Sequence, residues 1–133
     1  MSLKNALENS VKSYLAANVV GTCTFYTGFD HEDRVAPCCV IVLDSAESDP
    51  VNSSVYVVQL KVYVRDLPDG DIGDISEEIR TLLWASDMPS TVSAIGQVAV
   101  LGFAGAHRIE YDRDQNMYAE THTIQIAVAL TGA

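Results

Sequence analysis

Basic residues are scarce in this chain. Eight Lys and Arg stand against eighteen Asp and Glu, which gives a formal net charge of −10 over 133 residues. Such a surface repels phosphate, so we expect no specific binding of nucleic acid. Long apolar runs are missing as well, since no stretch reaches the ~18 residues of a membrane span. The N-terminal MSLKNALENSVKSYL lacks the apolar core of a signal peptide, which predicts assembly in a cytosol.

Cysteine is also sparse, with only Cys23, Cys38 and Cys39 present. An odd number without a secretory signal argues against a disulfide framework. Cys38 and Cys39 are adjacent, so on a strand they would face opposite sides and make a poor metal pair. We interpret both as small buried hydrophobic residues.

Catalytic and cofactor motifs are missing too. The three histidines, His31, His107 and His122, have no G-x-S-x-G elbow beside them, and the glycines form no phosphate-binding loop. Six acids fall within thirteen residues, but their spacing fails the EF-hand pattern in both registers tested. We therefore expect no enzyme activity, no cofactor and no metal. The six acids are Asp66, Asp69, Asp71, Asp74, Glu77 and Glu78.

The clearest positive signal is the alternation in SSVYVVQLKVYVRD, residues 53–66. Tyr56, Val58, Leu60, Val62 and Val64 share one face, which predicts a long strand with that face on a core. The other face is only partly polar. It includes Val55, Val57 and Tyr63, so we expect it to meet a partner.

The remaining pattern predicts an α+β fold in one domain over residues 1–133. Apolar spacing predicts helices over 3–17 and about 72–86, the second opened by a capping box at Asp74 and Glu77. Strands are expected at 23–26, 38–43, 94–106, 107–111 and 117–130, and loops at 44–53 and 86–97. We expect bends or bulges at the glycines of 94–106, and a hairpin in which residues 112–116 join the last two strands. The order is α, β, β, β, α, β, β: a mostly antiparallel sheet with both helices on one face.

This layout resembles the tail-terminator, or tail-completion, proteins of tailed bacteriophages. The likeness rests on element order and on the segments FYTGF…APCCVIV and VYVVQLKVYV…EEIRTLL, and it covers nearly the whole chain. It implies a structural virion protein, assembled in the host cytoplasm, that forms a ring, usually of six copies. Such a ring caps the head-proximal end of the tail tube, stops its polymerisation and joins it to the neck.

The implied partners are other copies of the chain, the tail tube protein, a neck or connector protein and, where a sheath exists, the sheath protein. DNA would only pass through the ring, and no membrane is involved. A closing ring needs two different patches on each subunit. We expect these at Val55, Val57 and Tyr63 and at the loop with Tyr26 and Phe29. The acids expected on the inner wall or on loop surfaces are Asp30, Glu32, Asp33, Asp69, Asp71 and Asp74.

Two alternatives stay open from the sequence. One is another neck component, such as a head–tail joining or stopper protein, which would bind the portal-side adaptor instead of the tube. The other is a small cytosolic ligand-binding or hydrolytic α+β domain. That alternative requires a deep pocket with converging polar groups, and it points to His107 and His122.

Overall fold

The computed structural model describes residues 3–21, 23–28, 37–48, 55–66, 72–84, 91–92, 96–103, 109–114 and 116–130. The helices and strands in this part of the chain are α1 (Leu3–Asn18), β1 (Thr24–Thr27), β2 (Cys38–Ser48), β3 (Val55–Asp66), α2 (Ile72–Leu83), β4 (Thr91–Val92), β5 (Gly96–Phe103), β6 (Ile109–Asp112) and β7 (Met117–Leu130). The α+β class predicted from the sequence is confirmed. The two-residue β4 was not predicted, whereas β6 corresponds to the strand expected at 107–111.

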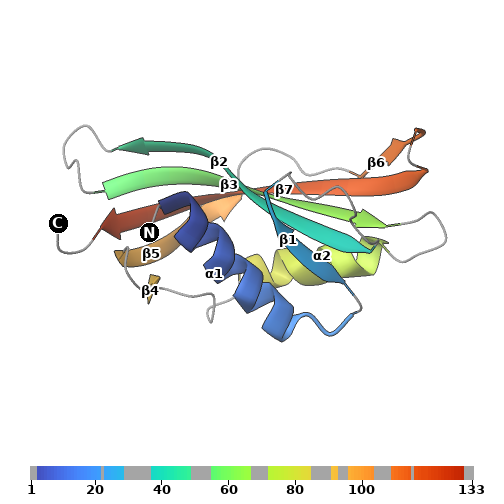
Figure 1. Cartoon of the computed structure of the whole chain (residues 1–133), viewed down its shortest axis with the longest axis horizontal. Helices are drawn as coiled ribbons and strands as arrows, with labels where there is room; N and C mark the ends of the chain where they lie inside the picture. The colour runs from blue at the N-terminus through green and yellow to red at the C-terminus, as the bar shows by residue number, and fades with distance from the viewer. Residues whose placement is uncertain are drawn as a thin grey trace.

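All the strands belong to one sheet, in the order β1-β2-β3-β7-β5-β4, and β6 pairs with β7 beyond the end of β5. The β1–β2 pair is parallel, whereas the other pairs are antiparallel. Figure 1 shows α1 and α2 below the long strands β2, β3 and β7. None of the described helices is long and apolar enough to cross a membrane.

The predicted alternation of β3 is confirmed. Val58, Leu60, Val62 and Val64 are completely buried, and the residues between them are partly exposed. The β7 partners of these three valines and one leucine are also buried, because the register places even-numbered residues of both strands on the same face. The core lies between this face and the two helices.

Both helices bury an apolar stripe in that core, as their spacing predicts. Helix α1 contributes Leu7, Val11 and Leu15, and α2 contributes Ile79 and Leu83. The two helices are also linked directly, because the Tyr14 hydroxyl donates to the Leu82 carbonyl at 2.7 Å.

A buried carboxylate ties α1 to β2. Glu8 is 2% exposed, and its Oε2 accepts a hydrogen bond from the Leu43 amide at 2.7 Å. Its Oε1 is 3.0 Å from Lys4 Nζ, one helical turn earlier. A buried charge is tolerated only with such partners, so Glu8 fixes where α1 crosses the sheet.

Two local predictions are wrong. Residues 44–48, expected in a loop, extend β2, because a register shift after Leu43 lets Ser45–Ser48 pair with β3. Pairing with a neighbouring strand has overridden the turn-forming composition of that segment. The capping box also fails. Since α2 begins at Ile72, Asp74 lies in its first turn instead of preceding it.

Other local predictions are confirmed. Strand β5 has the expected irregularity, a register shift between Val100 and Gly102, and Gly102 has a φ of 149° that side-chain-bearing residues rarely adopt. Strands β6 and β7 form the expected hairpin. Asn116 occupies the left-handed region in its turn, at φ 51°, a conformation that asparagine tolerates.

Candidate functional site

A hollow of about 530 Å³ opens between α2 and β5. It is lined by Glu77, Arg80 and Thr81 of α2, by Trp84 just after that helix, and by Phe103 at the end of β5. The side chain of Trp84 is 58% exposed. A large aromatic residue left in water beside an arginine is typical of a residue that anchors a protein–protein contact.

Aromatic and cationic side chains stack along this hollow. The Arg80 guanidinium carbon lies 3.8 Å from the centroid of the Phe103 ring, within the range of a cation–π contact. The rings of Trp84 and Phe103 have centroids 6.1 Å apart at an interplanar angle of 38°. Arg80 and Trp84 thus both contact the Phe103 ring.

A buried polar cluster lies behind the hollow. His122 of β7 is fully buried, with its Nε2 2.7 Å from Ser76 Oγ and 3.6 Å from Glu120 Oε1. Its Nδ1 is 3.4 Å from Arg80 Nη1. Because a guanidinium only donates, Nδ1 accepts here, and the proton of the neutral ring belongs on Nε2, facing the Ser76 oxygen.

This cluster does not have the geometry of a nucleophile with its base. In a Ser-His-acid triad the serine and the carboxylate contact opposite ring nitrogens. Here Ser76 and Glu120 both face Nε2, and the Arg80 cation occupies the side where the acid belongs. Ser76 and His122 are also 0% exposed, so a substrate would not reach them. The cluster fastens α2 onto β7.

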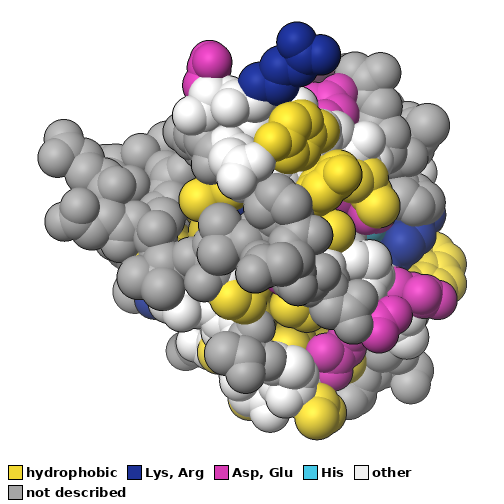
Figure 2. Space-filling model, turned by 90° about the vertical axis from the view of Figure 1, so that its right-hand side faces the viewer, with side chains coloured by type: hydrophobic (Ala, Val, Ile, Leu, Met, Phe, Trp, Pro, Cys, Tyr) yellow, Lys and Arg dark blue, Asp and Glu magenta, His cyan; other side chains and the backbone are white. Residues whose placement is uncertain are grey.

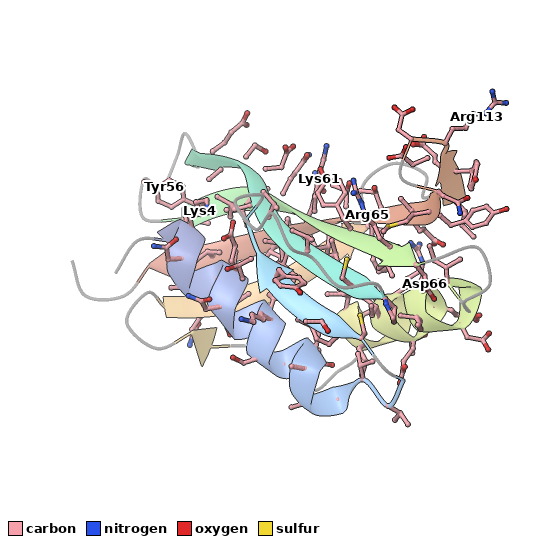
Figure 3. All side chains as sticks on the ribbon, turned by 45° about the vertical axis from the view of Figure 1, so that its right-hand side comes forward. Lys4, Tyr56, Lys61, Arg65, Asp66 and Arg113 are labelled. Carbon is pink, nitrogen blue, oxygen red and sulfur yellow. The ribbon has the colours of Figure 1, made fainter. Side chains whose placement is uncertain are left out.

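The outer face of β3 is the second candidate surface. Val57 is 37% exposed, and Val55 and Tyr63 are partly exposed. Figure 3 shows Lys61 and Arg65 extending from the side of the sheet opposite the helices. Lys61 Nζ lies 3.7 Å from Asp44 Oδ2 on the neighbouring strand. The face therefore mixes exposed valine with paired charges.

Several residues predicted for the site lie outside the described part of the chain: Phe29, Asp30, Glu32, Asp33, Asp69, Asp71 and His107. Of the other predicted residues, Tyr26 is partly exposed on β1, and Asp74 is exposed in the first turn of α2. Tyr26 and Val57 were predicted for two different patches, and they do lie on different strands. They belong to β1 and β3, separated by β2.

Sequence reasoning missed the hollow at α2 and β5. Trp84 is the chain's single tryptophan and comes directly after an amphipathic helix, a signal that was available. The pairing of Ser76 with His122 had no comparable signal, since 46 positions separate them.

Figure 2, from the end where β6 and α2 lie, shows hydrophobic side chains at the surface beside acidic ones.

The three cysteines differ in burial. Cys38 and Cys39 are buried, and all three thiols are free. Cys39 belongs to the core cluster and Cys38 does not, so adjacent residues face opposite sides, as predicted. Burial raises the pKa of Cys23 to about 12, with further contributions from Cys38, Asp66 and Glu78. Burial also raises the pKa of Cys39 well above its usual value.

Among the comparisons with known proteins, the one with solved structures is informative. No family model and no curated protein sequence matches the chain. Among solved structures, the chain resembles one from the virion of a native gene transfer agent (GTA) particle, with a TM-score of 0.61. The likeness shows a shared fold. It covers 93% of this chain and 95% of that chain, at 17% sequence identity.

Proposed function

We propose that this chain is a structural virion protein that forms a ring, usually of six copies, on the head-proximal end of a tail tube. The ring stops tube polymerisation and presents a surface for joining to the neck. The observation behind this proposal is the likeness to a virion chain over nearly the full length of both proteins. The element order and segments that resemble tail terminators support the same role.

The surfaces of the chain suit such a role. The outer face of β3, with Val57 37% exposed and Tyr63 partly exposed, is proposed as a contact surface in the assembly. The hollow beside Trp84 offers a second, chemically different patch. With two unlike surfaces, one subunit can contact different neighbours in the assembly, and a closed ring requires unlike patches on each subunit.

The charge of the chain suits a channel for DNA. A net charge of −10 disfavours phosphate contact along the wall of such a channel. Asp74, exposed at the start of α2, is the described member of the acids proposed for this wall. A ring whose bore proved neutral or basic would overturn the proposed lining.

The buried cluster weighs against the hydrolytic alternative. Ser76 and His122 are inaccessible and have the wrong partners for catalysis, so the proposal includes no enzymatic step. The neck-joining alternative differs only in its partner. Retention of purified tube protein on the immobilised chain would favour the terminator, and retention of the portal-side adaptor alone would favour the joining protein.

Removing the gene tests the proposed function most directly. Electron microscopy of particles made without this protein should show overlong tails or tails unjoined to heads. Supplying the wild-type gene separately should restore normal particles and controls for effects on neighbouring genes. Normal virions in the absence of the protein would reject the proposal.

A further inference from the structure

Among the described strands, the sheet has an edge strand with an unpaired side at each end. Strand β1 pairs with β2 on one side, and no described strand pairs with its other side. Strand β5 pairs with β7, and β4 covers only Gly96 and Gln97 on the far side. Within the described residues, Val98–Phe103 therefore has one strand neighbour only. An open edge presents backbone donors and acceptors on which another strand can pair.

The strands that lie along the two sides of the sheet differ in charge. Where β2 extends beyond β1, it carries Asp44 and Glu47, and β6 carries Glu110 and Asp112. By contrast, the sequences of β1, TFYT, and β5, GQVAVLGF, contain no charged residue and no proline. Natural sheets protect an exposed edge with charge or proline. In a chain of net charge −10, β1 and β5 are two edge strands that carry neither charge nor proline.

The strand directions also match. β1 is parallel to β2, and each later step from β2 through β3 and β7 to β5 is antiparallel. Hence β1 and β5 run in opposite directions. Two copies in the same orientation, related by a rotation, would bring β5 of one beside β1 of the other as an antiparallel pair, the arrangement joined by perpendicular hydrogen bonds.

The backbone of β1 is arranged for such pairing. The amides of Thr24 and Gly28 donate to the β2 side, to the carbonyls of Pro37 and Ile41 at 3.1 Å in both cases. Alternate residues of a strand direct their backbone groups to alternate sides. The N–H and C=O groups of Phe25 and Thr27 therefore face the open side.

We propose that β5 of one copy pairs with β1 of the next, so that one sheet continues from subunit to subunit. This inference rests on the ring-forming function proposed above and names the contact that closes the ring. Neither strand brings a charge that must be desolvated or a like charge that repels its partner. Pairing β5 with β5 would produce a two-fold dimer and leave β1 uncovered, whereas β1–β5 pairing covers both edges with one heterologous interface.

The hollow belongs to the same interface. Phe103 ends β5, and Trp84 stacks beside it. Helix α1 packs over β1 and β2, so a neighbour that adds its β1 to β5 also brings its α1 toward the exposed Trp84. The tryptophan then changes from an exposed side chain to an anchor buried between two copies.

Cysteine cross-linking tests the pairing. Thr24→Cys and Ala99→Cys place one thiol on each edge, at exposed positions. After mild oxidation, a mixture of the two variants, one of them tagged, should give a mixed disulfide dimer. The double variant should give a ladder that ends at the closed ring. The wild type, with its poorly reactive Cys23 and buried Cys38 and Cys39, is the background control.

Two results would overturn the pairing. Dimers of Ala99→Cys alone would indicate β5–β5 contact. Because a disulfide needs Cα atoms within about 7 Å, the β5 thiol is placed in turn at the exposed positions 97, 99 and 101. No mixed dimer with any of these at the highest soluble concentration would exclude β1–β5 contact. The matched pair Ala99→Lys and Ala46→Lys adds a second measurement, since both alanines are exposed on strands and only Ala99 lies on the proposed interface. Ala99→Lys should weaken association by about tenfold or more, and equal weakening by Ala46→Lys would contradict the proposal.

The two proposals fail separately. Overlong tails in particles without the protein, together with no mixed dimer, would leave the terminator function standing and reject the edge pairing. Normal particles without the protein, together with a cross-linked ring, would reject the function and keep the pairing.

Discussion

The hydroxyl oxygen of Ser76 lies 2.7 Å from Nε2 of His122. Both side chains are fully buried, so this contact joins α2 to β7 away from water. Replacing Ser76 by alanine removes the hydroxyl from a buried ring nitrogen, and we expect a loss of about 1–3 kcal/mol in the free energy of unfolding. Urea unfolding measures the loss. The control Ser13→Ala, exposed on α1, should stay within about 0.5 kcal/mol.

Glu8 gives a second stability prediction. Glu8→Ala leaves the Leu43 amide without the carboxylate it contacts at 2.7 Å, and we expect a loss of about 1.5–3 kcal/mol, as for a hydrogen bond to a charged group. Glu8→Gln keeps an acceptor oxygen and should lose less. Chemical unfolding of both variants gives the order. Equal losses would mean that packing, and not the hydrogen bond, is what Glu8 contributes.

The fold was predictable where one strong pattern repeats. The alternation in β3 and the apolar stripe of α2 were enough to predict those elements, because every residue of each pattern faces the core. The extension of β2 through Ser48 was not predictable, because it depends on β3 as a partner. The candidate site was largely unpredictable, since Arg80, Phe103 and His122 come from three separate elements that only the folded sheet brings together.

The thiols predict how stability depends on pH. Folding raises the pKa of Cys23 from 9.0 to about 12 and raises that of Cys39 as well. In the unfolded chain these thiols ionise above pH about 9, while in the folded chain they stay protonated. The two thiols should therefore leave stability unchanged below that pH and lower it as pH rises toward 12, with Cys23 contributing up to about 1.4 kcal/mol per pH unit.

Thiol variants check the cause of this decline. Unfolding free energies measured from pH 8 upward should fall less steeply for Cys23→Ala than for the wild type, because one of the two titrating groups is gone. An unchanged slope in this variant would mean that other groups, such as the tyrosines, govern the alkaline loss.

Trp84 provides an optical readout of assembly. It is the only tryptophan and is 58% exposed, so its emission in the isolated chain should be that of a largely hydrated indole. On ring formation the emission should shift to shorter wavelength. Trp84→Ala should change unfolding by less than about 1 kcal/mol and weaken association by about tenfold or more. An emission maximum that stays constant through assembly would place Trp84 outside the interface.

The outer face of β3 can be tested by adding charge. Val57→Glu combined with Tyr63→Glu should keep the fold, because both side chains are on the face away from the core, yet should block incorporation into particles. Circular dichroism reports the fold, and the protein content of purified particles reports incorporation. Ser45→Glu, exposed on β2, is the control. Normal incorporation of the double variant would mean that this face meets no partner.

The pairing of β3 with β7 also has a consequence for timing during synthesis. These strands form the centre of the sheet, and their register joins Val55 to Ala129. Pairing can begin at Asp66 and Tyr118, but it is complete only after the ribosome has made residue 129, and contacts this distant in sequence form slowly. Until then the uncharged β1 segment belongs to an incomplete sheet. Because many copies are synthesised close together on one message, this delay favours premature contacts between nascent chains.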